Sequence, residues 1–211
     1  MVAVIKTSKS LRNVLHYNEN KIEKKVAELI HSEGFAKDTE QLSLRDKLKT
    51  IEKRNSLRDD VSLSTLHVSL NFHAEDKIST EKMKAIACDY MERIGYGDQP
   101  FLVYRHFDAG HEHCHIVSTT IRSDGSNIRM FNIGRNQSTK ARIAIEKEFK
   151  LRPATATELK QAYELKPLNV PKVQYGKTET KHAITNVLDH VLPMYKYASL
   201  PESNAVLKLY N

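Results

Sequence analysis

The chain has 211 residues, of which 40% are hydrophobic and 28% are charged, so it is long enough to bury a core without disulfides. Its 33 lysines and arginines outnumber its 26 aspartates and glutamates, and the resulting formal net charge of +7 favours a polyanionic partner such as nucleic acid. No apolar run approaches the roughly 20 residues that span a bilayer, and the apolar start before Lys6 is too short for a signal peptide. We therefore expect no membrane insertion. Because Cys88 and Cys114 form no CxxC pair, we also expect a reducing, cytoplasmic setting.

The N-terminal third predicts one strand followed by helices. Residues 2–5 form a short β-like run, and Ser8 or Ser10 can then cap a helix. A second helix is predicted over residues 21–31, where apolar side chains recur at helical spacing. Residues 36–60 are highly charged, and we expect a helix and loops at the surface there.

The middle of the chain predicts a sheet. Apolar and polar residues alternate over Leu66–Phe72, which is the pattern of a half-buried strand. A helix follows, for which Thr80 is the expected cap with a partial capping box, and Gly95 and Gly97 end it. Three further predicted elements are strands over 101–107 and 111–122 and a helix over 141–149, with a turn at Asp124-Gly125.

The sequence becomes richer in proline after residue 150. Four of the six prolines lie between 153 and 193, and a fifth is Pro201, so helical pieces around extended links are expected. We therefore divide the chain into a main domain, residues 1–150, and a mostly helical C-terminal appendage, residues 151–211.

The most informative feature is a histidine cluster: four of the ten histidines lie between positions 106 and 115. If Ala109 and Gly110 form a two-residue hairpin loop, His106 faces His113 on the neighbouring strand. Side chains alternate along a strand, which puts five of them on one face of the hairpin: His106, Asp108, His111, His113 and His115. Opposed Cβ atoms lie about 4.5–5.5 Å apart, so three imidazoles can converge on one metal ion. A change of one residue in loop length would break this register.

We assign the metal to His106, His113 and His115, because three protein nitrogens leave positions open for substrate oxygens, as a catalytic site requires. Asp108 is expected to hold an imidazole N–H from behind. His111 is nearest the turn and can approach the substrate or carry a proton. The alternative is a set of ordinary surface histidines, which the spacing and the strand-like flanks disfavour.

The same stretch matches H-E-x-x-H, the zinc protease signature, from His111 to His115. That mechanism requires a helix, whereas Gly110 precedes the motif and a β-branched run follows it. On a strand, Glu112 would point away from the histidines. A zinc deaminase is also disfavoured because no P-C-x-x-C follows.

A metal with open positions on a basic protein favours phosphodiester chemistry, with either water or a side chain as the nucleophile. Tyr17 is the candidate side chain. It is flanked by polar residues and lies outside the apolar stripe of Leu11, Val14 and Leu15. The alternative is an ordinary half-exposed tyrosine, one of nine in the chain.

With these motifs the chain resembles the relaxases, or mobilisation nucleases, of conjugative and mobilisable elements such as plasmids. Their superfamily is named for a histidine–hydrophobe–histidine motif, which here is His113-Cys114-His115 with His106 upstream. The family's tyrosine motif matches Ser10–Tyr17. The strand over 66–73, its helix and Gly95-Tyr96-Gly97 resemble the middle motif of P-type mobilisation relaxases. The resemblance covers about residues 1–150.

The resemblance implies an α+β fold, a central antiparallel β-sheet flanked by helices, with the histidines on the sheet and the tyrosine on a nearby helix. It implies that the tyrosine attacks a phosphate at a transfer origin, forming a 5′-phosphotyrosyl link and freeing a 3′-hydroxyl. Mg²⁺ or Mn²⁺ is the expected ion, although three histidines also accept Zn²⁺ or Ni²⁺. The implied partners are single-stranded or hairpin DNA, accessory mobilisation proteins and a type IV secretion coupling protein.

Two features depart from the family pattern. Cys114 is small where a larger hydrophobe is common, and we expect it to pack behind the sheet. A single tyrosine in the N-terminal motif favours a relaxase over rolling-circle initiators, which have two. Two alternatives stay open: a replication initiator or water-using metal nuclease, and a non-enzymatic DNA-binding module with a structural metal. Five arginines are candidate phosphate contacts: Arg12, Arg105, Arg129, Arg135 and Arg142.

Overall fold

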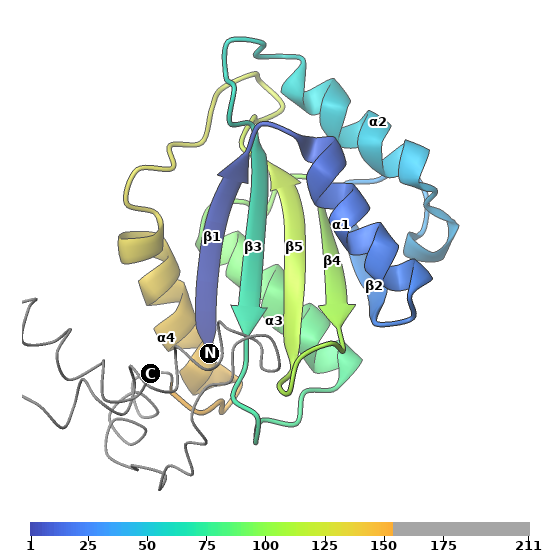
Figure 1. The fold of residues 1–211 in the computed structure, drawn as a ribbon. Coiled ribbons are helices and arrows are strands. Elements are labelled where there is room, and N and C mark those ends of the chain that lie inside the picture. The colour runs from blue at the N-terminus through green and yellow to red at the C-terminus, as the bar shows by residue number, and fades with distance from the viewer. Residues whose placement is uncertain (154–211) are drawn as a thin grey trace, which may run out of the picture. The chain divides into compact units, whose positions relative to one another are not determined.

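The computed structural model describes residues 1–153, which form a five-stranded antiparallel sheet with helices on both faces (Figure 1). The strands are β1 (Val2–Ser8), β2 (Ala27–Glu33), β3 (Thr65–Asn71), β4 (Phe101–His106) and β5 (His113–Thr119), in the order β1-β3-β5-β4-β2. The helices are α1 (Leu11–Glu23), α2 (Leu44–Asn55), α3 (Thr80–Arg93) and α4 (Thr139–Glu148). The expected α+β fold is thus confirmed, whereas the helical appendage predicted from 151 onward lies almost wholly outside the described residues.

The sheet has a hydrophobic core on each face. On one face, Leu15 of α1 and Ile51 of α2 pack against Tyr104 and Val117 of the central strands. On the other face, α3 and α4 cover a larger cluster that includes the neighbouring residue Ile116. This side-chain alternation along β5 decides which residues share the face of α1. None of the helices in residues 1–153 is both long and apolar enough to cross a membrane.

Helix α1 begins where the sequence predicts a cap. The Ser10 hydroxyl accepts a hydrogen bond from the Asn13 backbone N–H at 3.1 Å. Such an N-cap typically stabilises a helix by about 1 kcal/mol. Leu11 and Leu15 are buried, so the helix is fixed on the sheet and its polar side chains are turned away from the core.

The second predicted helix, over 21–31, is wrong. Helix α1 ends at Glu23, and the edge strand β2 follows after a turn in which Lys25 has a φ of 59°. A bulge after Leu29 interrupts the pairing with β4. Leu29 packs with the core under α1 and Ile30 with the core under α3, so adjacent apolar residues serve opposite faces of the sheet. Because β2 packs apolar residues on both faces of the sheet, these residues recur along the sequence at a spacing that resembles that of a helix.

Two smaller predictions also need correction. Helix α3 is capped by Ser79, whose hydroxyl accepts from the Lys82 backbone N–H, rather than by Thr80. The Thr80 hydroxyl instead accepts from Arg105. The hairpin of β4 and β5 has the predicted pairing of His106 with His113, but the strands end at that pair. The connection therefore spans residues 107–112 instead of two residues.

Candidate active site

The structure brings the three candidate metal ligands together on the face of the sheet that α1 covers. His106 ends β4, and His113 and His115 lie one alternation apart on β5. One ring nitrogen from each lies within 4.8 Å of the other two. The His106 ring centroid is 4.3 Å from that of His115 and 5.4 Å from that of His113. His106 and His113 are buried, and His115 is partly exposed.

A buried asparagine fixes the orientation of His106. The Asn18 side-chain N–H donates to the Val14 carbonyl at 2.9 Å, which turns its Oδ1 toward His106 Nε2, also at 2.9 Å. An amide oxygen can only accept, so Nε2 carries the ring proton of the neutral imidazole. The other nitrogen, Nδ1, is buried and has no hydrogen-bond partner. An unprotonated nitrogen in this position fits a metal ligand.

The two histidines of β5 each have a partner on one side of the ring. His113 Nδ1 is 3.3 Å from the carbonyl oxygen of His111, to which it can only donate. His115 Nδ1 is 2.9 Å from His67 Nε2 on the neighbouring strand β3. When His115 donates this bond, Nε2 is left unprotonated, as it is in His113. The residues present therefore fit a divalent ion held by three imidazoles.

Replacing Asn18 tests whether its hydrogen bond to His106 contributes to metal binding. Asn18→Ala removes the acceptor for His106 Nε2–H, so the ring loses the contact that fixes its rotation and its proton. Loss of such a supporting contact typically weakens metal binding about 10–100-fold. Calorimetric titration with Mn²⁺ or Zn²⁺ measures this effect, and Asn20→Ala, an exposed position on the same helix, is the matched control. Equal affinity in both variants would contradict the assigned role.

Burial favours the neutral form of three histidines of the site: His67, His106 and His115. Desolvation, with repulsion from neighbouring histidines and Lys21, lowers the pKa of His115 to about 3. Desolvation, with the charges of Lys21 and His113, lowers the pKa of His106 to about 4. The pKa of His67 is also lowered, chiefly by burial and then by Lys6. An ion arriving at neutral pH therefore has no proton to displace from His106 or His115.

These shifts predict acid sensitivity of the metal-free protein. Unfolded histidines bind a proton below about pH 6.5, whereas folded His106 and His115 do so only near pH 4 and 3. Since the unfolded state then binds more protons, stability is full above pH 6.5 and is lost as the pH falls. We expect the free energy of unfolding to drop by about 2 kcal/mol for each of the two groups between pH 7 and pH 5.

Urea unfolding of chelator-treated protein at the two pH values measures this drop. His115→Gln should lose part of the dependence, whereas the exposed His16→Gln should keep all of it. The prediction fails if unfolding of the parent protein is equally favourable at pH 7 and pH 5.

A carboxylate and a lysine lie beside the three imidazoles. Asp108 Oδ1 is 3.5 Å from His113 Nε2 and 3.8 Å from His106 Nδ1, the two nitrogens that face the ion position. Its other oxygen is paired with Lys21 of α1, and this hydrogen bond holds the pKa of Asp108 below its usual value. Burial alone would lower the pKa of Lys21, but its interactions with Asp108 and Tyr17 raise it. Asp108 therefore lies beside the ring nitrogens of His106 and His113 that are candidate metal ligands.

The Tyr17 side chain extends from α1 toward the three histidines that are candidate metal ligands. Its ring centroid lies 5.8 Å from that of His115 and 6.0 Å from that of His106. The Lys21 ammonium, one helical turn further along, is 4.9 Å from the centre of the Tyr17 ring. The tyrosine is 44% exposed, so an incoming strand can reach it while helix α1 holds its backbone. A phenol, an ammonium and a candidate metal position thus meet at one open surface.

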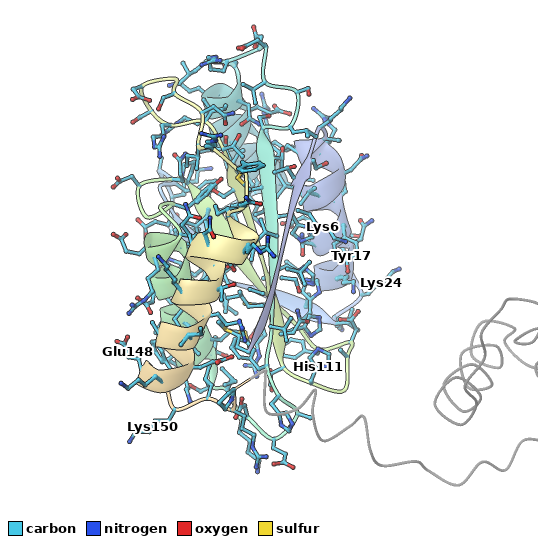
Figure 2. All side chains as sticks on the ribbon, turned by 90° about the vertical axis from the view of Figure 1, so that its left-hand side faces the viewer. Lys6, Tyr17, Lys24, His111, Glu148 and Lys150 are labelled. Carbon is cyan, nitrogen blue, oxygen red and sulfur yellow. The ribbon has the colours of Figure 1, made fainter. Side chains whose placement is uncertain are left out.

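His111 lies at the edge of this arrangement. It is exposed, its Nε2 is 3.3 Å from Asn71 Oδ1, and its ring centroid is 5.4 Å from that of His113. Figure 2 shows His111 on the same side of the sheet as Tyr17. Glu112 instead pairs with Arg105, which contacts Thr80 of α3 on the opposite face. The zinc protease arrangement is therefore excluded, because Glu112 and the histidines face opposite ways.

Three contributing residues were missed from the sequence: Asn18, Lys21 and His67. Asn18 and Lys21 follow Tyr17 on α1 and carry a usable signal, since Lys21 is four residues on and shares its helix face. His67 carries no local signal, because only strand pairing brings it to His115, 48 residues away.

Two of the candidate phosphate contacts are already occupied. Arg105 is engaged by Glu112 and Thr80. Arg142 bonds to the Met1 carbonyl and to Glu146. Arg12 lies 3.7 Å from Glu52, in an ion pair whose side chains are 66% and 49% exposed.

An antiparallel sheet that presents three converging imidazoles beneath a tyrosine defines a candidate nuclease centre. Comparison with known families then gives a specific result: the family model "Relaxase: MobA/VirD2-like, nuclease domain" matches residues 17–151, more than half of the chain. The chain belongs to this relaxase family. The match begins at Tyr17 and includes every histidine of the site. None of the curated proteins compared with the chain matches it. Membership implies a nuclease that binds DNA.

Proposed function

We propose that this protein is a metal-dependent relaxase that nicks one DNA strand at the transfer origin of a plasmid or other mobile element and stays joined to the new 5′ end through Tyr17. The observation that carries the proposal is the position of Tyr17: its ring lies within about 6 Å of two imidazoles whose unprotonated nitrogens face the same space. A water-using nuclease would not need a tyrosine here.

Three imidazoles would hold the ion through His106 Nδ1, His113 Nε2 and His115 Nε2. We expect Mg²⁺ or Mn²⁺ to be the working ion, and the same donors would accept Zn²⁺ or Ni²⁺. Its chemistry would be to neutralise charge on the scissile phosphate and to orient it. Asp108, beside two of these nitrogens, would fix the position of Lys21 and add an oxygen to the polar wall of the site.

The protein's own groups would carry the transfer. The Tyr17 oxygen attacks phosphorus, the bond from phosphorus to O3′ breaks, and the upstream strand leaves with a 3′-hydroxyl. The Lys21 ammonium, over the Tyr17 ring, stabilises the phenolate as the phenolic proton departs. His111, exposed at the mouth, would move protons between the reacting oxygens and solvent. The phosphodiester energy stays in the phosphotyrosyl bond, so the reverse attack by a 3′-hydroxyl rejoins the strand without ATP.

Covalent trapping tests this function. The protein is incubated with Mn²⁺ and a single-stranded DNA pool that includes transfer-origin sequences, then denatured and digested for mass spectrometry. We expect a nucleotide adduct on the peptide that contains Tyr17. Nicked DNA without an adduct would favour the water-using nuclease or initiator. A structural-metal DNA-binding module predicts no nicking with any origin, together with a large fall in melting temperature when metal is removed.

The proposed cellular role is conjugative mobilisation. The basic balance of the chain suits single-stranded or hairpin DNA at the origin. Accessory mobilisation proteins and a type IV secretion coupling protein would be the further partners. We place the reaction in the cytoplasm, where the unpaired thiols of Cys88 and Cys114 stay reduced.

A further inference from the structure

Part of the sheet surface beside the active site has no helix over it. Helices α1 and α2 cover β4 and β5, but the same face of the edge strand β1 is open, with Val2 and Val4 exposed by 47% and 42%. Viewed along the sheet, Lys6 lies on the same side as Tyr17 and Lys24, away from Glu148 on α4 (Figure 2).

A cavity of about 580 Å³ lies over this open surface. Its floor and walls come from Val4 and Lys6 of β1, Asn13 and Val14 of α1, and Ser69 of β3. Tyr17, His67 and His115 complete it, so the cavity opens directly onto the candidate nucleophile. The volume lies within the roughly 300–1,000 Å³ typical of small-molecule sites.

We propose that this cavity holds the nucleotide on the 3′ side of the nick, the one that becomes joined to Tyr17. The inference rests on the proposed function and follows from the stereochemistry of the attack. The attacking and leaving oxygens lie roughly in line through phosphorus, so the upstream nucleotide, which leaves with O3′, must extend away from Tyr17. The downstream nucleotide is attached at an equatorial position and can lie alongside the tyrosine.

The charge of the residues that line the cavity suits a nucleotide. None of its lining residues is acidic, and Lys6 is the only lysine or arginine among them. Within residues 1–153, Lys6 forms no ion pair, so its ammonium is free for the phosphate that follows the bound nucleotide. A lysine placed this way would act on any DNA sequence, because phosphate contacts position a strand without reading it.

The remaining lining suits a sugar and base. Val4 and Val14 offer aliphatic surface for the faces of the ring systems. Ser69 accepts a hydrogen bond from the Asn71 amide at 3.0 Å, which leaves its own hydroxyl proton free to donate. Asn13 adds an amide that can both donate and accept at a base edge. Apolar walls with a few polar groups are the usual composition of a small-ligand site.

Two isomeric probes test the placement without knowledge of the origin sequence. One is a mixed-sequence pool of deoxydinucleotides with a 5′-terminal phosphate, which mimics the downstream side of the nick. The other carries the terminal phosphate at its 3′ end and mimics the upstream side, with the same charge. Each is titrated into the isotopically labelled full chain with Mg²⁺, and amide chemical shifts are followed. We expect the 5′-phosphorylated pool to shift the amides of Val4, Lys6 and Ser69, and the 3′-phosphorylated pool to leave them unshifted.

Lys6→Gln should raise the dissociation constant of the 5′-phosphorylated pool roughly tenfold, as expected for one lost charged hydrogen bond. Val4→Glu, which adds a carboxylate to the acid-free cavity at an exposed edge-strand position, should weaken binding further. Lys24→Gln is the matched control, because Lys24 is exposed on the same side of the sheet but does not line the cavity. Its affinity should equal that of the parent protein.

Three results would overturn the placement: equal weakening by the two lysine variants, equal occupancy by the 3′-phosphorylated pool, or shifts confined to the basic groove of Arg45, Lys49 and Lys53 on α2. The covalent-trapping assay separates this failure from failure of the function. An adduct on Tyr17 with unchanged dinucleotide binding in Lys6→Gln refutes the nucleotide site alone. Selective binding of the 5′-phosphorylated pool with no adduct on any origin supports the site and refutes the tyrosine reaction.

Discussion

Replacing Tyr17 by phenylalanine is expected to abolish the covalent protein–DNA adduct and to lower the nicking rate by on the order of 10⁴-fold or more, as loss of a nucleophile does in other enzymes. The variant keeps the ring on α1 with its contacts to His106 and His115, and it lacks only the attacking oxygen. DNA binding, measured by fluorescence anisotropy, should therefore change little. Cleavage is measured with a labelled origin oligonucleotide under single-turnover conditions.

Tyr96→Phe provides the matched control for this result. It also removes one phenolic oxygen, but the Tyr96 hydroxyl contacts Met130 in the core on the opposite face of the sheet. Its nicking rate should match that of the parent protein. Cleavage by the Tyr17→Phe variant at the rate of the parent protein would contradict the tyrosine mechanism. An adduct on a different tyrosine would support the reaction class but contradict the assignment of Tyr17 as the nucleophile.

Loss of a metal ligand is expected to have the next largest effect. His113→Ala should lower nicking by about 10³-fold or more, because metal ions typically contribute several kcal/mol to stabilising charge in the transition state. Two imidazoles would remain, and the ion affinity should fall with the activity. Calorimetry with Mn²⁺ and single-turnover nicking measure the two losses together, and His16→Gln, exposed on α1, should change neither.

Chelation of the parent protein should give the same loss, and added Mn²⁺ or Mg²⁺ should restore activity. The melting temperature should move little on chelation, since His106, His113 and His115 are already held by Asn18, the His111 carbonyl and His67. Full activity in the chelated protein would contradict metal dependence. A collapse of the fold on chelation would favour a structural ion instead.

The hairpin register was predictable because it is local. Strand alternation and one short connection determine the pairing of His106 with His113, and the structure has this pairing although the connection is longer than two residues. The cap at Ser10 and the apolar stripe of α1 were equally local. Burial of Cys114 behind the sheet follows from the same alternation, and burial raises the pKa of its thiol to about 12.

Strand β2 was mispredicted because its environment is not local. Helices on both faces of the sheet bury both of its sides, so Leu29 and Ile30 are both apolar. A sequence window shows only that apolar residues recur, and it cannot show how many faces are covered. The pairing of Asp108 with Lys21 was unpredictable for a related reason, since Lys21 is 87 residues away on another element.

The sequence by itself thus determined the candidate reactive groups: an alternating set of histidines on one hairpin and a tyrosine outside the apolar stripe of a capped helix. Periodicity over a few residues decides which side chains share a face. The tertiary structure alone decided what surrounds them, because Asn18 reaches His106 across 88 residues and His67 reaches His115 through the pairing of β3 with β5. These contacts depend on strand order and helix packing, and they fix which ring nitrogens are free to bind an ion.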